Sequence, residues 1–68
     1  MIVNTLLRET AGQNLKAEIH FDDNDQTYNV KYYINGCFQA DRQLGKTDRI
    51  SVEEHARGWI DSVGVLKG

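Results

Sequence analysis

Two stretches of the chain alternate apolar and polar residues with the period of a β-strand. In residues 15–21 every second residue is apolar, and the residues between them are Lys16, Glu18 and His20. Residues 27–34 alternate in the same way, with the apolar side chains of Tyr28, Val30, Tyr32 and Ile34 on one face. A period of two is typical of a strand with one buried face, so we predict two strands here.

The segment between these strands, residues 22–26, is rich in Asp and Asn, which favour turns because their short side chains bond nearby backbone groups. A turn centred on Asn24 and Asp25 places Phe21 opposite Tyr28. It also places Ile19 opposite Val30, so the two apolar faces coincide. This agreement predicts an antiparallel hairpin.

A second hairpin is predicted by Asn35-Gly36, with a third strand over residues 37–44. A three-residue loop with Gly36 as a bulge would pair Tyr32 with Phe38 and Val30 with Ala40, and we expect this register. A two-residue loop would instead pair Ile34 with Cys37 and Tyr32 with Gln39. Phe38 and Tyr33 would then share the far face, and something else would have to cover them.

One helix is predicted near the carboxyl end. Ser51 and Glu54 have the spacing of a capping box, and Gly64 suits a helix stop. The apolar stripe at helical spacing consists of Val52, Ala56, Trp59, Ile60 and Val63. We expect this stripe to cross the apolar face of the sheet, with Trp59 near the centre.

The amino-terminal residues Ile2, Val3, Leu6 and Leu7 favour a short helix over a strand. The predicted fold class is therefore α+β, with residues 1–68 as one domain. A three-stranded antiparallel meander packs on one carboxyl-terminal helix, in the order αβββα, or βββα if the amino-terminal helix does not form.

Composition points to association with another protein. A chain of 68 residues buries only about 60% of its unfolded surface, and its single cysteine, Cys37, excludes an internal disulfide. We therefore expect a homodimer or a complex with a protein partner. The net charge of −2 disfavours nucleic acid and anionic membranes, and the start of the chain lacks the pattern of a signal peptide, so we expect a cytoplasmic protein.

No arrangement of residues predicts catalysis or a metal. The acidic turn lacks the glycine and the Glu that a helix–loop–helix calcium loop requires. His20, His55 and Cys37 lie on separate elements without the paired spacing of a zinc site. We therefore expect no enzyme activity, no metal and no cofactor.

The candidate binding surface is the sheet face opposite the helix, with Tyr33 as the anchor because aromatic residues are enriched at binding hot spots. Its expected members are Lys16, Glu18, His20, Asn29, Lys31, Tyr33, Gln39 and Asp41. Gly58 is added because a glycine inside a helix suggests close approach of another backbone. The alternative is a nucleic-acid-associated regulator that contacts phosphate through Arg42, Lys46 and Arg49.

Two resemblances extend these expectations. The order of elements looks like that of a double-stranded-RNA-binding domain, but this chain has SVEEH (51–55) where that family carries a lysine cluster. The segments KYYING (31–36) and EEHARGWI (53–60) are similar to short accessory proteins of tailed phages, notably those infecting marine cyanobacteria. That resemblance implies a small protein made in the host cytoplasm that binds and redirects a host protein.

Overall fold

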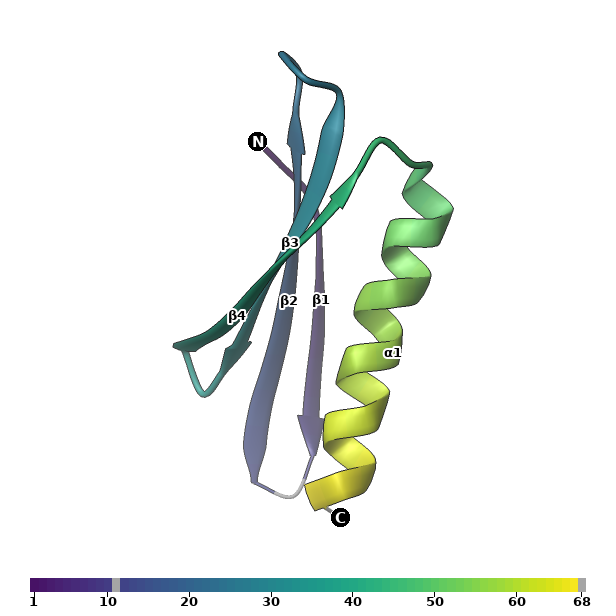
Figure 1. Ribbon diagram of the computed structural model, residues 1–68. Coiled ribbons are helices and arrows are strands. Elements are labelled where there is room, and N and C mark those ends of the chain that lie inside the picture. Colours follow the sequence, from purple (N-terminus) through teal and green to yellow (C-terminus); the bar gives the residue numbers. More distant parts are fainter. Residues whose placement is uncertain (11, 68) are drawn as a thin grey trace.

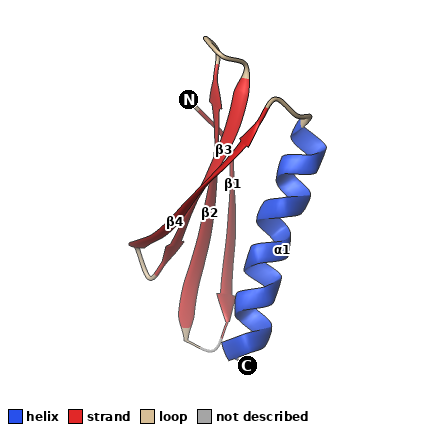
Figure 2. Cartoon of the chain, viewed as in Figure 1, coloured by secondary structure: helices blue, strands red, loops and turns tan. Residues whose placement is uncertain are grey.

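The computed structural model describes residues 1–10 and 12–67, with side chains described as far as Val63. In this part of the chain the elements are β1 (Ile2–Thr10), β2 (Gln13–Asp22), β3 (Thr27–Ile34), β4 (Cys37–Gly45) and α1 (Arg49–Lys67) (Figure 1). The strands form one antiparallel sheet in the order β1-β2-β3-β4, and α1 lies along one side of it (Figure 2). The α+β class, the meander and the carboxyl-terminal helix are confirmed.

The predicted amino-terminal helix is wrong, because residues 2–10 form a fourth strand. β1 pairs antiparallel with β2 from Ile2 opposite His20 to Thr10 opposite Gln13, with a bulge at Val3. The bulge lets both Val3 and Leu6 pack against the core under α1. A strand fits the β-branched residues of this segment, and pairing with β2 supplies hydrogen bonds that nine isolated helical residues would lack. With this strand in place the layout differs from that of a double-stranded-RNA-binding domain.

The core lies between α1 and the face of the sheet that we call the helix face. Leu15, Ala17, Ile19, Val30 and Tyr32 from the sheet are buried against Val52, Ala56 and Ile60 of α1, each no more than 4% exposed. The helix packs mainly on β2, with β1 and β3 at its sides. The predicted β2–β3 register is confirmed, with Phe21 opposite Tyr28 and Ile19 opposite Val30.

The turn between β3 and β4 has two residues, so the expected three-residue loop is wrong. Asn35 and Gly36 both have positive φ, 53° and 83°, the combination that matches the twist of a two-residue hairpin. Ile34 therefore pairs with Cys37 and Tyr33 pairs with Phe38. The extra residue lies within the strand at Gln39, which brings Ala40 opposite Tyr32 and back to the helix face.

Helix α1 begins at Arg49, two residues before Ser51, so Ser51 lies inside the helix and the prediction that it caps the helix is wrong. Asp48 Oδ1 accepts a hydrogen bond from the Ser51 backbone N–H at 2.8 Å, so Asp48 is the cap. Hydrogen bonds from the side chain and backbone of Ser51 hold the pKa of Asp48 below its ordinary value. The helix also continues through Gly64 to Lys67, so the predicted stop is wrong.

Trp59 lies at the side of the helix–sheet interface, and the expectation that it sits at the centre is wrong. Its ring stacks on Tyr32 with the ring centroids 4.3 Å apart, and it remains half-buried. Tyr28 and Val30 belong to the same core as Trp59, but Phe38 faces the other way. No helix in the described part of the chain is long and apolar enough to cross a membrane.

Candidate protein-binding face

The face of the sheet that points away from α1, which we call the far face, carries most of the predicted binding residues. The register aligns Lys16 with Tyr33, Glu18 with Lys31, and His20 with Asn29 across β2 and β3. These positions alternate with the buried residues of the helix face, so their side chains share the opposite face. Asp41 of β4 joins them opposite Lys31.

At the Asn35–Gly36 end of this face lies a compact group, Lys16, Tyr33 and Phe38, which we call the Tyr33 cluster. The rings of Tyr33 and Phe38 meet edge to face with their centroids 5.8 Å apart. The Lys16 ammonium lies 4.6 Å from the centroid of the Tyr33 ring. Phe38 is 57% exposed, so the cluster presents apolar area to its surroundings.

A polar network continues the far face away from the Tyr33 cluster. Glu18 accepts from Lys16 Nζ at 3.2 Å and lies 3.3 Å from His20 Nε2. Desolvation by burial raises the pKa of the Glu18 carboxyl, but the hydrogen bonds from Lys16 and His20 outweigh it, and the pKa lies below its ordinary value. Asn29 Nδ2 donates to Asp41 Oδ1 at 3.1 Å. Both signs of charge are therefore interleaved on this surface.

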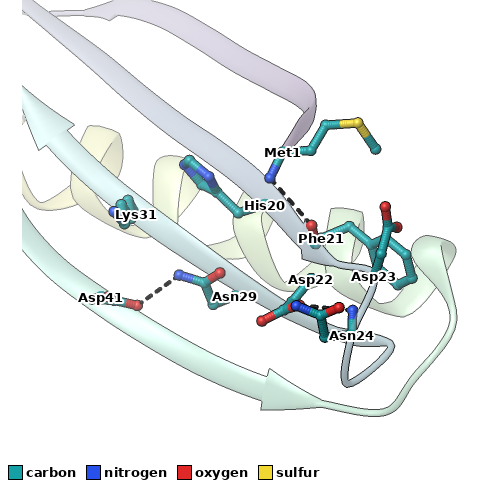
Figure 3. Close-up of a pocket in the computed structure, with 9 residues that line it drawn as sticks. All are labelled: Met1, His20, Phe21, Asp22, Asp23, Asn24, Asn29, Lys31 and Asp41. Carbon is teal, nitrogen blue, oxygen red and sulfur yellow. Dashed lines mark hydrogen bonds between the residues drawn. The ribbon is translucent and has the colours of Figure 1, made fainter.

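Beyond this network the far face ends in an open depression of about 510 Å³ beside the β2–β3 turn (Figure 3). Figure 3 shows His20, Lys31 and the hydrogen-bonded pair of Asn29 and Asp41 along its strands, with Met1 at the other side. At the turn, Asp22 Oδ1 accepts from the Asn24 backbone N–H at 2.9 Å. The acidic turn thus uses a carboxylate to hold its own backbone, as expected of turn residues.

Two of the predicted binding residues lie outside the aligned rows of the far face. Gln39 is the bulged residue of β4, and its side chain donates to the Cys37 carbonyl at 3.3 Å. Gly58 lies on α1 and lines an open groove of about 460 Å³ beside Trp59, Tyr32 and Arg42. A Cβ built on Gly58 meets nothing within 4 Å, so no backbone in the described chain makes the close approach that we had expected there.

The three basic residues of the nucleic-acid alternative have different surroundings. Arg42 faces the groove beside Trp59, and Lys46 is exposed in the loop before α1. Arg49 is held in place, because its Nε donates to Glu53 Oε2 at 3.1 Å and its Nη2 donates to the Val3 carbonyl at 3.0 Å. The ion pair with Glu53 reduces the positive charge that Arg49 can offer to a phosphate.

The soft metal ligands stay apart. No group of three or more His, Cys, Asp or Glu side chains within residues 1–10 and 12–63 could hold a metal ion. His20 lies on the far face and His55 is exposed on α1. Cys37 is a free and exposed thiol at the start of β4.

Phe38 is the main residue of the candidate face that the sequence did not assign to it. The bulged-loop hypothesis placed Phe38 under the helix, whereas the two-residue turn places it beside Tyr33. The Asn-Gly dipeptide was the available signal, since it strongly favours two-residue turns. Leu7, 74% exposed opposite Lys16 on β1, was also missed, because its strand was predicted as a helix.

Comparison with known proteins identifies no relative of this chain. A scan against protein-family models gives no match, and neither do searches of curated proteins and of solved structures. The similarity to phage accessory proteins therefore stays a hypothesis.

Proposed function

We propose that the chain is a small non-enzymatic binding module whose far face contacts a protein partner, with Tyr33 and Phe38 as anchors. The observation that carries the proposal is the edge-to-face pair of these rings, with Phe38 exposed and Tyr33 half-buried, on a face that α1 leaves open. Aromatic side chains bring large apolar contact area with few rotatable bonds, which is why they dominate binding hot spots.

The surroundings of the Tyr33 cluster suit a protein better than a nucleic acid. Glu18 and Asp41 lie among Lys16 and Lys31, so the rim of the cluster is polar and of mixed charge. Protein interfaces commonly combine an aromatic centre with such a rim. A phosphate backbone requires a surplus of positive charge, and this chain carries a net charge of −2.

The resemblance to phage accessory proteins gives the partner a class. On that hypothesis the partner is a host protein, and the two proteins meet in the host cytoplasm. A surface of about three anchoring side chains with a polar rim suits a modest, reversible contact.

The proposal is tested by comparing the wild-type chain with Tyr33→Ala and Phe38→Ala. Each protein is immobilised and exposed to host lysate, and the captured proteins are quantified by mass spectrometry. The affinity of any captured partner is then measured by titration calorimetry with purified components. We expect each substitution to weaken binding by about tenfold or more, as for other aromatic hot spots.

Ile50→Ala is the control, because Ile50 is an exposed apolar residue that lies on α1, outside the far face. It should leave the affinity unchanged, and thermal unfolding should show that all three variants fold. If the Tyr33 and Phe38 variants bind the partner as tightly as the wild-type chain, or if no protein is captured above a blank surface, the proposal is wrong.

A further inference from the structure

Every second residue of β1 turns its backbone groups outward, away from β2. Asn14 donates its N–H to Asn35 Oδ1 at 2.9 Å, and its C=O accepts from the Asn35 N–H at 2.8 Å. Asn14 therefore gives no backbone hydrogen bond to Glu9, its partner across β1 and β2. The N–H and C=O groups of Glu9 therefore point outward, away from β2. Since hydrogen-bonded and non-hydrogen-bonded pairs alternate in antiparallel sheets, the same groups of Leu7 and Thr5 also point outward.

The first half of this outer edge is closed by side chains. The Val3 carbonyl accepts from Arg49 Nη2 at 3.0 Å, and the Thr5 N–H donates to Asn4 Oδ1 at 2.9 Å. Asn4 and Arg49 are themselves held by Glu53, to which each donates at 3.1 Å. The start of α1 thus protects the edge as far as the Thr5 N–H.

The second half is open. Among the described residues nothing bonds the outward groups of Leu7 and Glu9 or the Thr5 carbonyl. The Leu7 side chain is 74% exposed. Two shallow hollows adjoin Leu7. The first, of about 310 Å³, is lined in part by Leu6 and Ile60, and the second, of about 320 Å³, is lined in part by Leu15. An edge with unpaired backbone groups beside apolar surface is a template for another strand.

We propose that two copies of this chain pair antiparallel through this open half of β1, with Leu7 opposite the Leu7 of the second copy. In this register the Leu7 N–H of each copy donates to the Leu7 carbonyl of the other copy. The Glu9 N–H of each copy likewise donates to the Thr5 carbonyl of the other. Four free donors thus meet four free acceptors. The Thr5 N–H, which Asn4 already binds, is not needed.

Charge excludes a shift toward the carboxyl end of β1, and a shift the other way would need the Thr5 N–H, which Asn4 already binds. A shift in one direction would place Arg8 opposite the Arg8 of the second copy, and a further shift would place Glu9 opposite Glu9. Like charges directly opposite each other destabilise a strand pair. The register centred on Leu7 instead places Leu7 against Leu7 and Thr5 against Glu9.

The other edge of the sheet is protected against the same pairing. β4 carries irregularities at Gln39 and Leu44, which interrupt its row of backbone groups. Pairing centred on Asp41 or on Arg42 would also set like charges against each other. The second copy therefore binds at β1, and the resulting eight-stranded sheet places two far faces side by side, which goes beyond the binding role proposed above.

Sedimentation equilibrium on the wild-type chain and on Leu7→Lys tests the proposal. The wild-type chain should reach twice its monomer mass of 7.8 kDa as concentration rises. Leu7→Lys sets two ammonium groups opposite each other and should raise the dimer dissociation constant at least ~tenfold. Ile50→Lys, at an exposed apolar residue of α1 outside both the far face and the open half of β1, should leave the dimer intact.

Cross-linking fixes the register. Hydrogen-bonded antiparallel partners have Cα atoms about 5.5 Å apart, within reach of a disulfide. In a Cys37→Ser background, Leu7→Cys should form a covalent dimer on mild oxidation, whereas Thr5→Cys, opposite Glu9, should not. A wild-type chain that stays monomeric at millimolar concentration overturns the proposal, as does a dimer that Leu7→Lys leaves unchanged or equal cross-linking of the two cysteine variants.

Discussion

The face of the sheet under α1 buries Ile19 and Val30 completely, whereas the far face of the same strands leaves the ring of Phe38 more than half exposed. Neighbouring residues of one strand therefore have different roles. Tyr32 stacks on Trp59 inside the core, and Tyr33 packs against Phe38 outside it. The buried apolar contacts that stabilise the fold are therefore concentrated on the helix face, and the far face is free for the contact proposed above.

The largest effect is expected from a cavity on the helix face. Ile19→Ala should lower the free energy of unfolding by about 2–5 kcal/mol, since Ile19 is fully buried at the centre of the helix–sheet interface. Urea titration followed by circular dichroism measures the change. Phe38→Ala on the far face is the comparison and should cost no more than about 1.5 kcal/mol, the value of one aromatic pair. Equal losses would contradict the division between the faces.

A smaller effect is expected at the turn that places Phe38 on the far face. Gly36 has φ of 83°, so Gly36→Ala should cost about 1–2 kcal/mol through backbone strain alone. Gly58→Ala is the matched change, because a Cβ there also meets nothing. Since Gly58 lies inside a helix, this substitution should raise the free energy of unfolding by about 0.5–1 kcal/mol. Urea titration measures both changes. If Gly36→Ala destabilises the fold and Gly58→Ala stabilises it, the loss at Gly36 comes from the conformation of the turn. A stabilising Gly36→Ala would argue against the two-residue turn.

Two adjacent tyrosines give a sharper contrast. The Tyr32 Oη is buried and has no hydrogen-bond partner in the described part of the chain, and burial raises the pKa of this hydroxyl although Arg42 opposes the rise. Tyr32→Phe removes an unsatisfied polar group and should stabilise the fold by up to about 1 kcal/mol. Tyr33→Phe, on the far face, should change the melting temperature little. A marked loss of stability in Tyr32→Phe would show that the hydroxyl has a partner.

The smallest effect is expected from the charges of the far face. The pKa of Glu18 is lowered in the folded chain, so its contribution to stability is present above the ordinary carboxyl pKa and is lost as pH falls through the folded value. As pH falls from about 5 to 3, the melting temperature should decrease more steeply for the wild-type chain than for Glu18→Gln. If the melting temperatures of the two proteins depend on pH in the same way, the contacts of Glu18 with Lys16 and His20 do not stabilise the fold.

The sequence predicts β2, β3 and their register, because apolar and polar residues alternate strictly in both strands and the acidic turn fixes their offset. β1 escapes prediction because its apolar residues come in adjacent pairs. The bulge at Val3 turns two successive residues toward the core, and Leu7 is exposed. The candidate face is predicted where alternation holds, at Lys16, Glu18, Lys31 and Tyr33. Phe38 is misplaced because the turn is predicted with three residues although Asn35-Gly36 favours two, whereas the bulge at Gln39, which returns Ala40 to the helix face, leaves no local signal.

Nuclear Overhauser effects between aromatic rings in a carbon-13-labelled sample show on which face of the sheet Phe38 lies. If Tyr33 and Phe38 form the aromatic pair of the far face, the Phe38 ring protons should show contacts with Tyr33 and none with Trp59, whose contacts should be with Tyr32. Contacts between Phe38 and Trp59 would place Phe38 under the helix. They would leave the far face without its anchor and contradict the account.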